Sequence, residues 1–159
     1  FEHLVKAFLR FLDNSKTEDI SLAIIGVKRA GYEALNRLVA EQKSYQDKIV
    51  LTGFVVDEDM AALYSQAEVF IYPSLYEGFG LPVLEAMQCG TAVVCSDNSS
   101  LPEVGGEAVQ YISGHDEAET ARVLSELYYN DTLKEKLQIQ GLERAKYFSW
   151  KRSVDEIFK

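Results

Sequence analysis

The chain has 159 residues, of which 47% are hydrophobic and 26% are charged, a composition typical of one globular domain without low-complexity segments. Its formal net charge of −9 argues against a nucleic-acid-binding surface, because affinity for nucleic acid comes mainly from lysine and arginine. No apolar run reaches the roughly 18 residues of a membrane span, and no segment resembles a secretion signal. We therefore expect a cytoplasmic protein, either free or, at full length, peripheral to the membrane.

The first half of the chain alternates helical and extended patterns. Apolar residues recur at helical spacing from Leu4 to Leu12 and predict an opening helix, which nothing precedes to cap, so we expect a piece of a longer protein. Residues 21–26 form a continuous apolar run that ends in glycine, as in a strand buried on both faces. A helix is predicted over residues 32–43 and a second strand over residues 49–54.

The second half continues the alternation. Asp57 is the predicted N-cap of a third helix, and residues 68–72 form the third predicted strand. After a glycine loop, a helix is expected from about Pro82 to Cys89. Further predicted elements are strands over residues 91–95 and 108–112, a polar turn over 97–100, helices over 117–129 and 132–146, and a last helix from Trp150.

Apolar strands that alternate with helices predict an α/β fold, a doubly wound parallel sheet of the Rossmann-like kind. Ligands of such sheets bind beyond the carboxyl ends of the strands. Three loops fall there: the loop after Gly26, the segment at residues 53–55, and residues 74–81. Cys89 and Cys95 lack the spacing of a metal site and are expected to be reduced thiols.

The loop before the fourth helix has the chemistry of an anion site. Gly78 and Gly80 carry no side chain that would keep a ligand from the backbone amides. Pro82 suits the first helical turn and Gly90 suits the C-terminal cap, so the loop precedes a helix N-terminus. Such a terminus carries partial positive charge and unpaired donors, which stabilise an anion.

Two carboxylates, Glu77 and Glu85, flank this loop and make the prediction more specific. Carboxylates oppose phosphate, but they accept hydrogen bonds from vicinal hydroxyls, as in the recognition of a ribose. A diphosphate between two polyols satisfies both features at once. The sequence therefore predicts a nucleotide sugar as the ligand.

Residues 77–85, Glu-Gly-Phe-Gly-Leu-Pro-Val-Leu-Glu, resemble the signature of the retaining GT-B glycosyltransferases of family four, also described as glycosyl transferases group 1. Ile49–Phe54 followed by Leu63-Tyr64, and Thr91–Ser96 followed by Leu101–Val104, are similar to the neighbouring segments of that family. Together these segments cover roughly residues 20–115.

The resemblance implies one half of a GT-B fold that lacks its first strand. Residues 1–159 would be the C-terminal nucleotide-sugar-binding domain, with the N-terminal acceptor domain absent. An Arg and a Lys that neutralise the departing diphosphate in the family would precede Phe1. This fragment alone is therefore expected to be inactive.

The resemblance also implies roles for individual residues. Glu77, the catalytic candidate, would contact donor-sugar hydroxyls near the anomeric carbon, and Glu85 would bind the ribose. The remaining donor-binding residues would act through their backbones: Gly78, Phe79, Gly80 and Leu81 on the sugar and diphosphate, and Gly53, Phe54 and Val55 around the base. No metal and no cofactor other than the donor substrate is expected.

The implied function is transfer of a hexose from a UDP- or GDP-hexose, with retention, to a carbohydrate or lipid-linked acceptor such as a growing polysaccharide. The acceptor would bind the missing N-terminal domain. Departure and attack on the same face of the sugar is the family's usual description. A covalent intermediate on Glu77 is the alternative retaining mechanism.

The same residues allow other interpretations of the function and of the motifs. A non-catalytic nucleotide-binding module and a nucleotide-sugar epimerase of the same fold stay as alternatives. Residues 26–31 have the spacing of a phosphate-binding P-loop, but Tyr32 and Glu33 stand where Lys and Ser or Thr are required. Val83 occupies the third glycine position of a dinucleotide fingerprint. Glu103 is read as a family match or a turn residue, and Asp97, Ser99 and Ser100 as a solvated turn.

Overall fold

The computed structural model describes residues 1–26, 31–113 and 116–158, so most of the rejected P-loop pattern lies outside the described residues. The chain divides into two compact units. Unit 1 comprises Phe1–Met60 with His115–Glu126, and unit 2 comprises Ala61–Gly114 with Leu127–Lys159. The donor-loop prediction falls in unit 2 and the base-pocket prediction in unit 1.

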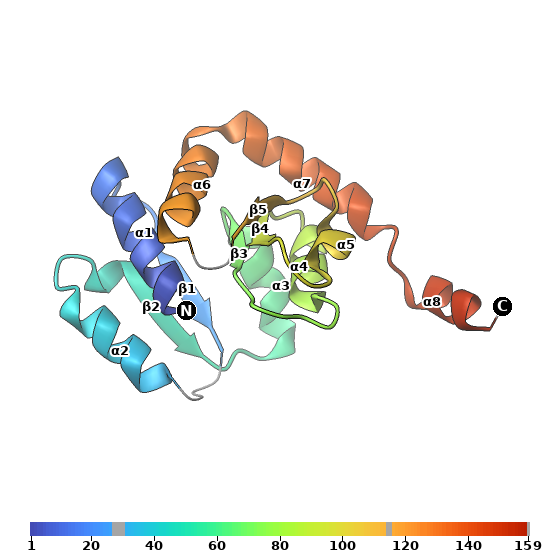
Figure 1. The fold of residues 1–159 in the computed structure, drawn as a ribbon, viewed down its shortest axis with the longest axis horizontal. Coiled ribbons are helices and arrows are strands. Elements are labelled where there is room, and N and C mark those ends of the chain that lie inside the picture. The colour runs from blue at the N-terminus through green and yellow to red at the C-terminus, as the bar shows by residue number, and fades with distance from the viewer. Residues whose placement is uncertain (27–30, 114–115, 159) are drawn as a thin grey trace. The chain divides into compact units, whose positions relative to one another are not determined.

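Unit 1 contains a parallel pair of strands with helices beside it (Figure 1). Its elements are α1 (Glu2–Ser15), β1 (Leu22–Ile25), α2 (Tyr32–Glu41), the 3-10 turn η1 (Gln46–Lys48), β2 (Ile49–Gly53), the start of α3 (Asp57–Gln66) and most of α6 (Glu117–Tyr129).

The apolar stripe of α1 is buried, as its helical spacing predicts. Val5, Phe8, Phe11 and Leu12 are each at most 3% exposed. The strand β1 pairs with β2 from Leu22 opposite Ile49 onward. The apolar run of β1 predicts burial on both faces, but of its four residues only Ile24 is buried.

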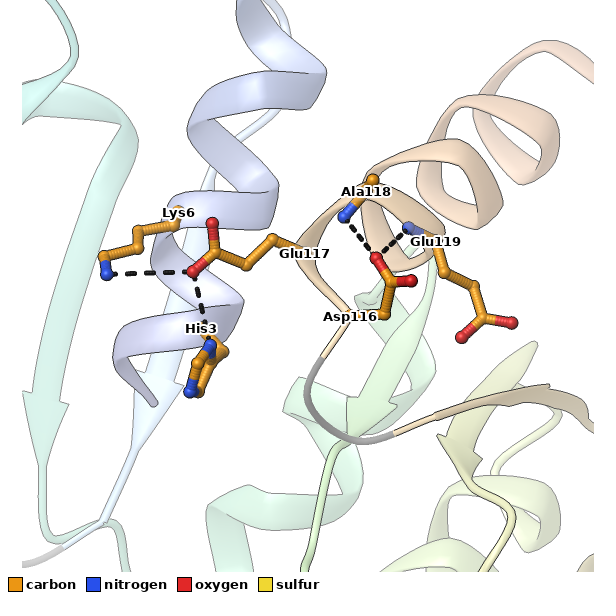
Figure 2. A network of polar contacts seen from close by, with 6 residues as sticks. All are labelled: His3, Lys6, Asp116, Glu117, Ala118 and Glu119. Carbon is orange, nitrogen blue, oxygen red and sulfur yellow. Dashed lines mark hydrogen bonds and ion pairs between the residues drawn. The ribbon is translucent and has the colours of Figure 1, made fainter.

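A polar cluster joins α1 to the start of α6 within unit 1 (Figure 2). The Oε1 atom of Glu117 lies 3.2 Å from His3 Nδ1 and 3.7 Å from Lys6 Nζ. Asp116 caps α6, because its Oδ1 accepts hydrogen bonds from the amides of Ala118 and Glu119. The ion pairs are solvent-exposed, so each contributes at most about 1 kcal/mol.

Unit 2 contains a parallel sheet in the order β3-β4-β5, with α4 in contact with β3, β4, α5 and α7 (Figure 1). Its complete elements are β3 (Phe70–Tyr72), α4 (Leu81–Gln88), β4 (Val93–Ser96), α5 (Leu101–Gly105), β5 (Gln110–Ile112), α7 (Asp131–Ala145) and α8 (Trp150–Ile157).

The core of unit 2 forms where α4 packs on α7. All four residues of β4 are buried, and Val83, Ala86 and Met87 of α4 are fully buried. A Cβ atom built on Gly141 of α7 would lie 3.3 Å from Met87 Cγ, so the glycine permits the close approach of the two helices. These buried contacts hold the start of α4 next to the end of β3.

The α/β class with parallel strands is confirmed, with several local differences. The hydrogen-bonded strands form two sheets, β1-β2 and β3-β4-β5, where the sequence predicts one. Asp57 is the first helical residue of α3, one position after a cap, and α4 begins at Leu81, one residue before the predicted start. The helix α5 was not predicted; its five residues are too few to show a helical period. None of the helices in the described part of the chain combines the length and apolar character that crossing a bilayer requires.

Candidate functional site

The candidate site is the signature loop, residues 73–80, which connects the carboxyl end of β3 to α4. Gly80 ends the loop with a φ of 99°, a left-handed conformation that glycine adopts without strain. A Cβ atom on Gly80 would lie 2.6 Å from Leu101 Cδ2, and Leu101 is fully buried. Glycine is therefore required here both by the backbone conformation and by the contact with α5.

The amides of residues 78–81 have no hydrogen-bond partner in the described part of the chain. Among the described residues, these four amides donate no hydrogen bond to another part of the chain, whereas the amide of Val83 already bonds to the Gly80 carbonyl. They lie at the N-terminus of α4, where the helix dipole favours negative charge. These amides are thus donors without a partner among the described residues, and the anion site stays a prediction.

Glu77 is held by two hydroxyl groups. The hydroxyl of Tyr72, at the end of β3, donates to Glu77 Oε1 at 2.6 Å. The hydroxyl of Ser74 donates to the same oxygen at 2.7 Å. Burial, and then the hydrogen bond to Glu77, raise the pKa of Tyr72, so its hydroxyl remains a donor at neutral pH.

Glu85 projects from α4 and has one hydroxyl partner. The hydroxyl of Tyr64, a buried residue of α3, donates to Glu85 Oε2 at 3.1 Å. Thr91 fixes Tyr64 in turn, because its hydroxyl donates to the Tyr64 carbonyl at 2.6 Å. Burial, followed by the charge of Glu85, raises the pKa of Tyr64.

Tyr72 connects the two carboxylates. Burial is the largest cause of its raised pKa, but the charges of both Glu77 and Glu85 add to it. Both glutamates therefore act electrostatically on the same tyrosine, and a ligand shared by the two stays a prediction. The sequence reasoning missed Tyr64 and Tyr72, because both read as ordinary apolar positions of a helix and a strand.

The turn between β4 and α5 braces the signature loop. Ser99 Oγ accepts a hydrogen bond from the Glu77 amide at 3.0 Å. Ser100 Oγ lies within 3.0 Å of the carbonyl oxygens of Glu77 and Phe79. Asn98 donates to the Ser74 carbonyl at 3.1 Å. The sequence reasoning interpreted this turn as solvated. The missed signal is topological: β3 and β4 are parallel neighbours, so the segments that follow them meet at one edge.

The side chain of Phe79 packs against another aromatic ring, while its backbone amide belongs to the loop. Its ring lies edge-on to Phe148, with the ring centroids 5.8 Å apart. The Arg144 guanidinium lies 5.1 Å from the Phe148 ring and donates to the Val104 carbonyl at 3.0 Å. The loop is thereby packed against the segment that joins α7 to α8.

The predicted base-pocket residues Gly53, Phe54 and Val55 belong to unit 1. Gly53 ends β2, and its carbonyl accepts a hydrogen bond from the amide of Gly26 at 3.0 Å. Phe54 is 70% exposed. Unit 1 also has a cavity of about 330 Å³ at the carboxyl end of β1, lined in part by Gly26, Tyr32 and Leu51; residues 53–55 are not among its lining residues.

Comparison with known protein families finds one match that covers most of the chain. A family model described as "Glycosyl transferases group 1" matches residues 1–144. The matched range includes the signature loop and both predicted parts of the donor site.

Three curated relatives illustrate the similarity. O-antigen chain mannosyltransferase B of Escherichia coli is 46% identical over 119 residues, which cover 74% of this chain and 31% of that protein. The MMP alpha-(1->4)-mannosyltransferase of Mycolicibacterium hassiacum is 39% identical over 72% of this chain and 28% of its own length. The D-inositol 3-phosphate glycosyltransferase of Corynebacterium jeikeium is 30% identical over 98% of this chain and 38% of its own length. The chain thus spans between about a quarter and two fifths of these relatives.

Solved structures share the fold. Sucrose-phosphate synthase of Thermosynechococcus elongatus superposes with a TM-score of 0.78 at 23% identity, over 97% of this chain and 41% of the other. The pneumococcal O-GlcNAc transferase GtfA, in complex with UDP and GlcNAc, gives a TM-score of 0.78 at 24% identity, over 98% of this chain and 33% of the other.

Proposed function

The chain belongs to the glycosyl transferases group 1 family, and from this premise we propose that residues 1–159 are the C-terminal, donor-binding domain of a longer hexosyltransferase. The longer protein would transfer a hexose from a nucleotide-diphosphate sugar, with retention, to an acceptor such as a growing polysaccharide. The acceptor would be a carbohydrate or a lipid-linked glycan bound by an N-terminal domain. We favour mannose as the hexose, because two of the relatives named above are mannosyltransferases.

One observation carries the proposal: the loop presents four available amides beside two glutamates that each keep one carboxylate oxygen for a ligand. In the described residues, the hydroxyl donors occupy Glu77 Oε1 and Glu85 Oε2. The amides and the dipole of α4 suit the diphosphate, and the remaining carboxylate oxygens suit sugar hydroxyls. We assign Glu77 to the hexose and Glu85 to the ribose.

Stabilisation of the leaving diphosphate would come from these aligned amides and from basic residues, without a metal. Oriented donors aimed at a developing charge are effective because they need no reorganisation during the reaction. In this scheme Glu77 acts on the hexose from one side of the loop while the amides hold the leaving group.

The strand order supports the assignment as one half of a GT-B fold that lacks its first strand. A doubly wound sheet has the order 3-2-1-4-5-6, with its first strand in the centre. Suppose that β1 to β5 correspond to strands two to six of such a sheet. Without the first strand, that order leaves one pair, 3-2, and one trio, 4-5-6. Those are the observed sheets β2-β1 and β3-β4-β5.

The test is titration of the full-length enzyme with UDP- and GDP-hexoses, followed by turnover assays with a glycan acceptor. We expect one nucleotide sugar to bind and its hexose to be transferred. Glu85→Gln, which removes the charge that accepts the ribose hydroxyls, should weaken donor binding by at least about tenfold. Glu107→Gln, an exposed glutamate of the same unit, is the matched control.

Two outcomes would contradict the proposal. One is the absence of nucleotide-sugar binding, and the other is unchanged donor affinity in Glu85→Gln. Conversion of the donor to an epimer without acceptor would favour the epimerase alternative.

A further inference from the structure

We propose that Tyr72 and Ser74 are positioning residues that hold Glu77 by one carboxylate oxygen and so direct the other oxygen to a single hydroxyl of the donor hexose. This inference rests on the proposed function and deepens it. It assigns sugar selectivity to two side chains that need not touch the sugar themselves.

The backbone of Glu77 is fixed on both sides. Its amide donates to Ser99 Oγ at 3.0 Å, and its carbonyl accepts from Ser100 Oγ at 3.0 Å. Three residues later, Gly80 is fixed against Leu101. The freedom left to Glu77 therefore lies in its side-chain torsions.

Those torsions are fixed by two donors on the same atom. Tyr72 and Ser74 both donate to Oε1, at 2.6 and 2.7 Å. Ser74 Oγ also lies 3.3 Å from the Tyr76 carbonyl oxygen, but its one proton is better placed for the shorter contact to Glu77. The Tyr72 ring is itself stacked on Phe70, with the centroids 5.9 Å apart.

The consequence is an asymmetric carboxylate. Oε1 is occupied, whereas in the described part of the chain Oε2 accepts no hydrogen bond and is left for a ligand. Glu85 offers a contrast, because it is solvent-exposed and has one donor at 3.1 Å. Glu77 is thus the more tightly oriented of the two, which suits the recognition of one hydroxyl by direction.

The experiment is a double-mutant cycle in the full-length protein, in which each enzyme variant is measured with several donor analogues. Wild type, Tyr72→Phe, Ser74→Ala and the double variant are each assayed with the preferred nucleotide hexose and with its mono-deoxy analogues. Because either hydroxyl alone can hold Oε1, we expect each single variant to lose at most about tenfold in kcat/KM. The double variant should lose about a hundredfold or more, beyond the product of the single losses.

The decisive readout is selectivity. In wild type, removal of the hydroxyl that Glu77 contacts should cost far more than removal of any other. In the double variant this particular penalty should shrink by about tenfold, while affinity for the free nucleotide diphosphate stays unchanged. In the Tyr72→Phe background, Ser74→Thr keeps a hydroxyl and should therefore retain the selectivity that Ser74→Ala loses.

Matched controls make the same chemical changes elsewhere in unit 2. Ser65→Ala on α3 and Tyr129→Phe on α6 should behave as wild type. A double variant with wild-type selectivity, or one that loses activity equally with every donor, would overturn the positioning role. Failure of wild type to use any nucleotide hexose would instead refute the proposed function.

Discussion

The two signature glutamates have different surroundings. Glu77 is held at one oxygen by two hydroxyls, whereas Glu85 has one longer hydrogen bond. Both arrangements depend on tyrosines that stay protonated, and burial keeps the pKa of Tyr64 and of Tyr72 above its ordinary range. The hydroxyls therefore donate through the whole neutral range of pH.

Cys95 gives a pH-dependent prediction that does not depend on the function. Burial, and then the charge of Asp97, raise its pKa from 9.0 to about 12. Because the folded pKa is the higher one, the thiol contributes stability below pH 9.0, and this contribution is lost as the pH rises towards the folded value. At about pH 8, we expect Cys95 to react with a thiol reagent far more slowly than the partly exposed Cys89. Mass spectrometry of labelled peptides, with a urea-unfolded control, measures this, and equal rates in the folded protein would contradict it.

At the scale of elements, the signature loop depends on its neighbours. The β4–α5 turn bonds to its backbone, α5 packs on Gly80, and Phe148 contacts Phe79. Arg144 of α7 ties these supports together, because it bonds to carbonyls of α5 and stacks on Phe148. The loop is thus a rigid connection whose shape is set by three segments distant in sequence.

Gly80 and Gly78 provide a matched pair for testing this rigidity. Gly80→Ala places a Cβ at a positive φ and 2.6 Å from Leu101 Cδ2, so we expect a loss of about 1–3 kcal/mol in the free energy of unfolding. Gly78→Ala meets nothing within 4 Å and has no positive φ, so its stability should stay within about 0.5 kcal/mol of wild type. Denaturant unfolding followed by hydrogen exchange in α4 separates the two, and equal losses would argue against a fixed loop.

At the scale of the whole molecule, the strand order and the greater length of the relatives both fit a longer protein. Each unit has its own parallel sheet, and the chain covers 31% of the E. coli mannosyltransferase that it resembles. The fold is shared with solved glycosyltransferases at a TM-score of 0.78.

The strand order makes a prediction for that longer protein. We expect a strand before Phe1 that pairs with β1 along one edge and with β3 along the other, completing a six-stranded order. A structure of the full-length protein, or protection of the β1 and β3 edge amides from hydrogen exchange, would test it. Direct pairing of β1 with β3 would show the expectation to be wrong, because it leaves no place for the missing strand.

How much of the fold could be predicted from the sequence depends on how far apart in the chain the residues that determine each feature lie. The predicted ranges of α6 and α7 match the structure to within one residue, and the apolar stripe from Leu4 to Leu12 lies inside α1, because helical patterns are a local property of the sequence. The five-residue α5 was missed, since it is shorter than two helical turns. The starts of β3, β4 and β5 were each placed two residues too early, because hydrogen-bond pairing with a neighbour decides where a strand begins.

The amino-acid sequence by itself determined the α/β class, the glycine loop before α4 and the presence of two glutamates, one in the loop and one in the helix. These follow from residue types and short spacings. Only the tertiary structure decided which hydroxyls hold those glutamates and that the 98–100 turn supports the loop. The reason is physical: these contacts join residues up to 24 positions apart, and the turn meets the loop only because parallel strands bring their carboxyl ends to one edge.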